Sequence, residues 1–165
     1  MAEPADRQRS RVYAAESQVI RIIDRRDEFP TIQLFGSDVV VPDDRKFGDL
    51  DSAQRYVDAV LALNWVRQRW PGLGSVTVRA RSAAQRAHYE PATATIALPP
   101  FEGGGGWALR ELVVLHEVAH HLVPGTPSHG PGFVAAVLVL VGELLGPEAE
   151  FLLRTTYLEN GVRLG

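Results

Sequence analysis

The stretch His116-Glu117-Val118-Ala119-His120 (residues 116–120) is an HExxH motif. Residues four apart on a helix stand above one another with Cβ atoms roughly 5–6 Å apart, so both imidazoles can reach a single ion. Glu117 projects about 100° around the helix from His116. A carboxylate there can accept a proton from water on the ion without binding the ion itself. The spacing therefore predicts a metal site with His116 and His120 as ligands and Glu117 as general base.

Three apolar residues extend the face of the two histidines toward the N-terminus. They are Leu109, Leu112 and Val113. They predict an amphipathic helix over residues 107–122, with both imidazoles at its buried end. The alternative is a pair of ordinary core histidines beside an exposed Glu117. Burying two imidazoles without a metal would demand hydrogen-bond partners for both rings, so we favour the metal site.

The identity of a third ligand is open between two residues. A third histidine in the extended HExxHxxGxxH pattern is excluded, because Val123 and Thr126 stand at the required positions. Glu143 is the one acid in a very apolar helix predicted over residues 131–145. His129 follows a Pro/Gly-rich segment that breaks the preceding helix, and the Gly130-Pro131 pair after it begins the next one. A histidine at such a corner can turn back toward the metal.

The two motifs together resemble a known family. Residues 115–121 followed by His129-Gly130-Pro131-Gly132-Phe133 resemble the SprT-like zincins, and more closely a small family of actinobacterial metallohydrolases, over residues 11–161. The resemblance implies that the two motif histidines and His129 bind zinc and that Glu117 is the base. The chain differs from many SprT-like proteins in having no cysteine zinc ribbon, and from their DNA-acting members in having no basic surface.

Composition limits the class of protein. The 165 residues include 45% hydrophobic and 22% charged residues, which predicts one globular domain over residues 1–165. Cysteine is absent, so a metal site must use histidines and carboxylates. The net charge of −3 offers no footprint for nucleic acid. Residues 1–11 lack the apolar core of a signal peptide, and residues 133–145 are too short to span a bilayer, so we expect a cytoplasmic protein without membrane contact.

Apolar periodicity predicts an α+β fold of the zincin type, in which a small antiparallel sheet packs on the HExxH helix. The expected helices cover residues 11–23, 107–122, 131–145 and 147–159, with a further one from a cap at Asp51 or Ser52 to Pro71-Gly72. Residues 31–41 predict a strand or hairpin, and residues 75–81 and 93–98 alternate as strands that could pair. Residues 103–106, four glycines, predict a loop. We expect residues 93–98 to form the sheet edge to which an extended peptide adds.

Several other side chains are weaker candidates. His121 points about 100° away from His120, which favours a supporting or surface position over metal binding. His88 or Tyr89, before the predicted edge strand, and Tyr157 in the last helix could polarise a substrate carbonyl, with ordinary packing as the alternative.

The sequence thus predicts a zinc-dependent hydrolase acting on peptides or proteins. Hydrolysis of a small amide or ester is one alternative, which a deep closed pocket would favour. A catalytically silent interaction domain stabilised by a metal is another. Glu117 argues against the silent domain, because a structural zinc site gains nothing from a base.

Overall fold

The computed structural model describes residues 5–82, 86–99 and 108–165. The chain divides into two compact units, one made of Met1–Asp44 with Gly125–Gly165 and the other of Arg45–Pro124. This division does not test the predicted single catalytic domain, which stays a prediction. The described residues form six α-helices and two small sheets, so the α+β class is confirmed. The predicted glycine loop at 103–106 and the predicted helix start at Trp107 lie outside the described residues.

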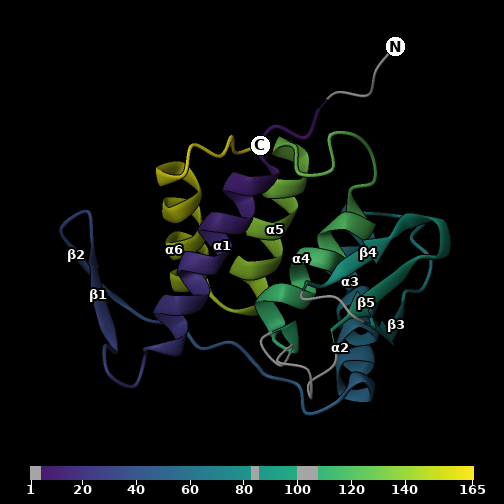
Figure 1. Cartoon of the computed structure of the whole chain (residues 1–165), viewed down its shortest axis with the longest axis horizontal. Coiled ribbons are helices and arrows are strands. Elements are labelled where there is room, and N and C mark those ends of the chain that lie inside the picture. Colours follow the sequence, from purple (N-terminus) through teal and green to yellow (C-terminus); the bar gives the residue numbers. More distant parts are fainter. Residues whose placement is uncertain (1–4, 83–85, 100–107) are drawn as a thin grey trace. The chain divides into compact units, whose positions relative to one another are not determined.

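Three helices form the core of the first unit. They are α1 (Arg9–Asp24), α5 (Pro131–Leu144) and α6 (Pro147–Glu159), and α6 packs against both of the others (Figure 1). Their buried side chains are mostly apolar, and include Val12, Val19, Ile23, Val137, Leu140, Leu152 and Leu153. Both α5 and α6 begin with a proline, which suits the first helical position because its missing N–H would have no partner there. All three predicted helices are confirmed.

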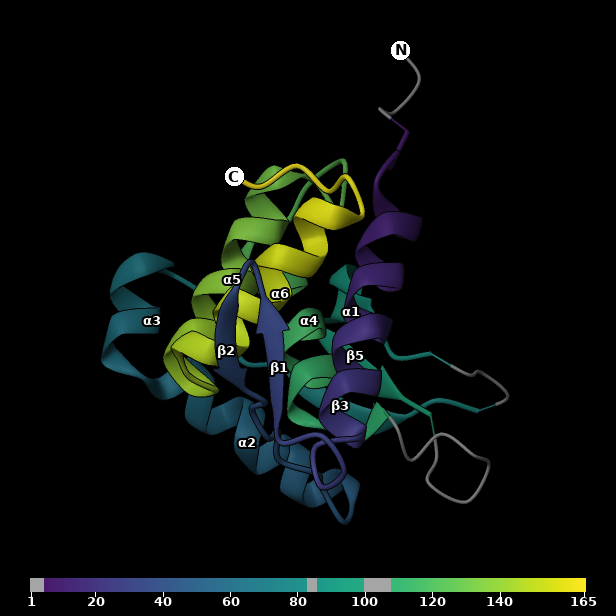
Figure 2. The same ribbon diagram turned by 90° about the vertical axis from the view of Figure 1, so that its left-hand side faces the viewer.

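The first unit also carries a β-hairpin, seen as a narrow ribbon in Figure 2. Strands β1 (Thr31–Leu34) and β2 (Ser37–Val40) pair antiparallel. The two residues between them have positive φ, 50° at Phe35 and 77° at Gly36, as expected for the tight turns that match strand twist. The predicted strand or hairpin is therefore a hairpin. Phe35, at its tip, is 79% exposed.

In the second unit, α2 (Leu50–Ala62) and α3 (Asn64–Arg69) replace the single helix expected there. The predicted cap at Asp51 or Ser52 is wrong, because the helix begins earlier. The Asp49 side chain accepts the Ser52 backbone N–H at 2.7 Å, and the Ser52 hydroxyl accepts the Asp49 N–H at 3.3 Å. This reciprocal pair is a capping box, which satisfies two N–H groups that the helix itself cannot.

The sheet of the second unit has three strands in the order β3-β5-β4. Strand β3 (Thr77–Ala80) runs parallel to β5 (Thr95–Leu98), and β4 (His88–Glu90) runs antiparallel to it. The short 3₁₀ turn Pro91–Thr93 joins β4 to β5, which makes these two strands antiparallel neighbours. Strand β3 then pairs along the other side of β5.

This order corrects two predictions. Residues 75–81 and 93–98 do pair, but in parallel, so the wholly antiparallel sheet is wrong. The strand expected at the edge, β5, is the central strand of the described sheet, and all four of its residues are buried. A peptide therefore cannot add to β5 as a further strand.

The helix that carries the HExxH motif is α4 (Glu111–Leu122), which begins after the predicted start at residue 107. It contacts β4 and α2 within the second unit, so the predicted packing of this helix on the sheet is confirmed. No helix in the described part of the chain is long and apolar enough to cross a membrane.

Candidate metal centre

The two motif histidines lie one turn apart on α4. Their ring centroids are 5.0 Å apart with an interplanar angle of 72°. His116 is only 2% exposed and His120 is half-buried. The expectation of an amphipathic helix is wrong, because α4 is buried around almost its whole circumference and not only on the histidine face. Both rings nevertheless project from one face, as the i, i+4 spacing requires.

Glu117 lies in the same helix and is 3% exposed. This burial contradicts the alternative in which two core histidines flank a solvent-exposed glutamate. A carboxylate is stable in a buried position only where neighbouring groups compensate its charge.

Hydrogen bonds hold the first turn of α4. The buried carboxylate of Glu111 accepts the Tyr56 hydroxyl at 2.5 Å and the Arg45 backbone N–H at 3.0 Å. The Glu111 N–H in turn donates to the Arg45 carbonyl at 2.8 Å. Since Tyr56 belongs to α2, these bonds fix the start of the helix five residues before His116. Sequence reasoning missed this role, although an acidic residue in a first helical turn is a recognisable signal.

The last turn of α4 is held through His121. Its Nε2 lies 2.9 Å from the Gly74 carbonyl oxygen, and its Nδ1 lies 2.8 Å from the Tyr89 hydroxyl of β4. A carbonyl can only accept, so Nε2 carries a proton, and in the tautomer with a single ring proton Nδ1 accepts the Tyr89 hydroxyl proton. Burial raises the pKa of Tyr89, which keeps this hydroxyl protonated. His121 thus supports the helix, and the Tyr89 hydroxyl is occupied by its hydrogen bond with His121.

His129 is placed by a tight turn before α5 in the first unit. The Gly130 N–H donates to the Pro127 carbonyl at 3.1 Å, and the Gly130 carbonyl accepts the Val134 N–H that begins the helix. A Cβ atom at residue 130 would lie 3.2 Å from the Pro127 oxygen, so glycine is favoured there. The turn fixes the backbone of His129, which is 4% exposed.

Two residues ahead of α1 contact His129. Asp6 Oδ2 lies 2.6 Å from His129 Nδ1 and accepts the Ser128 hydroxyl at 3.0 Å. The Gln8 side-chain amide donates to the His129 carbonyl at 2.6 Å. Partial burial by itself would raise the pKa of Asp6, but the hydrogen bonds from His129 and Ser128 outweigh it and lower that pKa. Asp6 is therefore ionised at neutral pH. Neither Asp6 nor Gln8 was singled out from the sequence, since no local pattern marks them.

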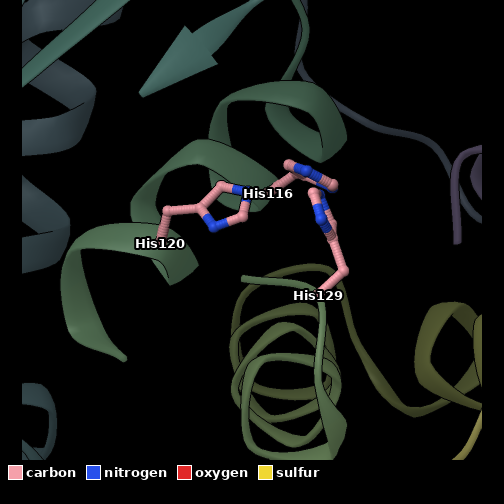
Figure 3. A group of neighbouring side chains, drawn as sticks. All are labelled: His116, His120 and His129. Carbon is pink, nitrogen blue, oxygen red and sulfur yellow. The ribbon is translucent and has the colours of Figure 1, made fainter. Parts of the chain in front are cut away.

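His116, His120 and His129 form a group that could hold a metal ion. One ring nitrogen from each lies within 4.8 Å of the other two (Figure 3). These are the three histidines that the sequence nominated. Glu143, the competing third ligand, is exposed near the end of α5 and does not belong to the group.

The remaining candidates have other partners or positions. The Tyr157 hydroxyl donates to Glu16 at 2.5 Å in the core of the first unit. Burial and the neighbouring Glu16 carboxylate raise the pKa of Tyr157 well above its ordinary value. His88 is exposed at the start of β4. Tyr157 therefore serves packing in this structure, and His88 does not belong to the group of three histidines.

Comparisons of the chain with protein-family models, with curated proteins and with solved structures give no match.

Proposed function

We propose that the chain is a zinc-dependent hydrolase, with a peptidase as the leading candidate, in which His116, His120 and His129 bind the metal and Glu117 is the general base. The observation that carries this proposal is the group of three histidine nitrogens within 4.8 Å of one another. Burial of Glu117 next to His116 in sequence adds the base that a purely structural zinc site would not use.

The donor set fits zinc. Three neutral imidazole nitrogens are a known ligand set for catalytic zinc, which keeps a further position open for water or substrate. Zinc–nitrogen bonds of about 2.0–2.1 Å would bring the three ligand nitrogens closer together than the 4.8 Å limit of the group. No carboxylate is needed from Glu143, and cysteine is absent from the chain.

In this proposal, metal binding and proton transfer fall to different residues. The three histidines hold the ion, which when bound acidifies water and polarises a carbonyl. Glu117 takes the proton from the attacking water and then returns it to the leaving group, so one carboxylate serves as base and as acid. The hydrogen bonds of Glu111 and His121 hold the two ends of α4, and thereby keep the two motif histidines and Glu117 in fixed register.

The proposed peptide substrate rests on the HExxH motif and on its family resemblance. One further argument for it, addition of a peptide to the sheet edge, no longer holds. The sequence placed an extended peptide along β5, whose place at the centre of the sheet removes that binding mode. Small amides or esters are therefore the second candidate. A substrate screen should include unfolded proteins, peptide libraries and chromogenic esters and amides.

The test separates metal binding from turnover. The wild type should contain about one zinc per chain by elemental analysis, and His116→Ala should lose it. Glu117→Gln keeps the shape of the side chain but cannot accept a proton, so it should retain zinc while hydrolysis falls by about 10²–10⁴-fold. Glu159→Gln, an exposed glutamate at the end of α6, is the matched control and should be unchanged. Absence of zinc after supplementation refutes the metal site, and wild-type turnover by Glu117→Gln refutes the mechanism.

A further inference from the structure

The side chain and backbone of His129 are both held by the segment that precedes α1. Asp6 contacts the ring at Nδ1, 2.6 Å away, and Gln8 donates to the backbone carbonyl, also at 2.6 Å. The Gln8 side chain also accepts the backbone N–H of Arg163 at 3.0 Å, which ties this segment to the C-terminal residues of the same unit. Two contacts from residues more than a hundred positions away in sequence therefore converge on one histidine.

The Asp6 contact determines which nitrogen of His129 carries the proton. An Asp side chain in its ordinary form at neutral pH is a carboxylate, which only accepts hydrogen bonds. In a neutral His129 ring the proton therefore lies on Nδ1, 2.6 Å from Asp6 Oδ2. The Ser128 hydroxyl donates to the same carboxylate oxygen at 3.0 Å and is more distant, 3.3 Å, from His129 Nδ1. Ser128 therefore supports Asp6 and does not compete for the ring. Nε2 keeps its lone pair, which is the form of imidazole that binds a metal.

Aromatic side chains restrict the plane of the same ring. The Tyr13 ring of α1 lies 5.3 Å from the His129 ring centroid, and the Phe133 ring of α5 lies 5.0 Å away in an edge-on arrangement. This packing limits rotation of the His129 ring, and the Asp6 carboxylate holds the Nδ1 edge of the ring toward itself. Asp6 Oδ1 is buried with no hydrogen-bond partner among the described residues, so the hydrogen bonds of this carboxylate with Ser128 and His129 both fall on Oδ2.

We propose that Asp6 is a positioning residue for the third metal ligand, holding His129 as the Nδ1–H tautomer with Nε2 directed to the ion. This inference rests on the proposed metal site. In metalloproteins a carboxylate behind a histidine ligand fixes the tautomer, orients the ring and makes its free nitrogen more basic. The segment before α1 is then part of the metal centre, although it is remote from the HExxH motif in sequence.

Zinc affinity is the direct readout, measured by competition with a chelating dye. Asp6→Ala should weaken zinc binding by about 10–100-fold. Asp6→Asn should weaken it less, because the amide oxygen can still accept the Nδ1 proton but carries no charge. Asp27→Asn removes an equal charge from an exposed position in the same unit and should bind zinc as the wild type does. Circular dichroism confirms folding of each variant, and Asp6→Asn decides the question if Asp6→Ala does not fold.

The tautomer gives a second readout that a merely structural residue would not change. Nitrogen-15 NMR of the metal-free protein should show His129 protonated at Nδ1 in the wild type, with loss of that preference in Asp6→Ala. Wild-type zinc affinity in both Asp6 variants, or an equal loss in Asp27→Asn, overturns the role of Asp6 and leaves the proposed function standing. A wild type that binds no zinc overturns the proposed function and this inference with it.

Discussion

Replacing Glu111 by alanine should lower the free energy of unfolding by about 3–6 kcal/mol. Its buried carboxylate accepts two hydrogen bonds, from the Tyr56 hydroxyl at 2.5 Å and from the Arg45 N–H at 3.0 Å. A hydrogen bond to a charged group contributes about 1.5–3 kcal/mol, and removing the carboxylate also leaves both donors without this partner. The loss is large because it falls on the first turn of α4, which the sheet and α2 hold in place.

Tyr56→Phe removes only one of the two bonds and should cost about 1.5–3 kcal/mol. Combined with Glu111→Ala, it should add little, because the shared hydrogen bond can be lost only once. Urea unfolding followed by circular dichroism measures all three variants. Glu148→Ala changes an exposed acidic residue in the first turn of α6 and should alter stability by no more than about 0.5 kcal/mol. A loss below about 1 kcal/mol for Glu111→Ala, or full additivity with Tyr56→Phe, would refute this account of the helix start.

Three other outcomes follow from the same structure. His129→Ala should weaken zinc binding by more than about 100-fold in the dye competition, whereas Glu143→Gln should leave it unchanged, and the reverse result would reassign the third ligand. Removal of zinc by a chelator should lower the melting temperature, and an unchanged melting curve would show that the metal contributes nothing to folding. The unfolded chain releases a tyrosine proton near pH 10.0 and folded Tyr157 holds its proton to higher pH, so wild-type stability should fall as the pH rises above that value. Tyr157→Phe should show a shallower alkaline decline in urea unfolding, even though loss of the donor to Glu16 lowers its stability at neutral pH.

The helices were predictable because their signals are local. Pro131 and Pro147 mark the starts of α5 and α6, and apolar spacing marks the buried face of α1. The cap of α2 was misplaced by only a few residues, since Asp49, Asp51 and Ser52 are all residue types that cap helices. Local sequence therefore predicts that a helix begins in this region, but not which of several suitable side chains caps it.

The sheet was less predictable because strand pairing is not local. Alternation of apolar residues shows that a segment is a strand, but it does not show whether its neighbour runs parallel or antiparallel. Strand β4 has only three residues, too few to show an alternation, so its insertion beside β5 was not anticipated. Once β4 takes one side of β5 and β3 the other, β5 becomes the central strand and its predicted role as an edge is lost.

The choice between His129 and Glu143 shows where sequence reasoning about the site ends. The i, i+4 spacing relates His116 and His120 through one helix, so these two could be paired from the sequence alone. The other two candidates lie at opposite ends of α5: His129 precedes its first residue, Pro131, and Glu143 lies in its last turn, twelve residues after Pro131. At a rise of about 1.5 Å per residue, roughly 18 Å of helix separates those ends, so one ion cannot be bound by both residues. Selection of either ligand therefore excludes the other. The structure favours the N-terminal end, where Asp6 accepts a hydrogen bond from the His129 ring and Gln8 donates one to the His129 backbone carbonyl.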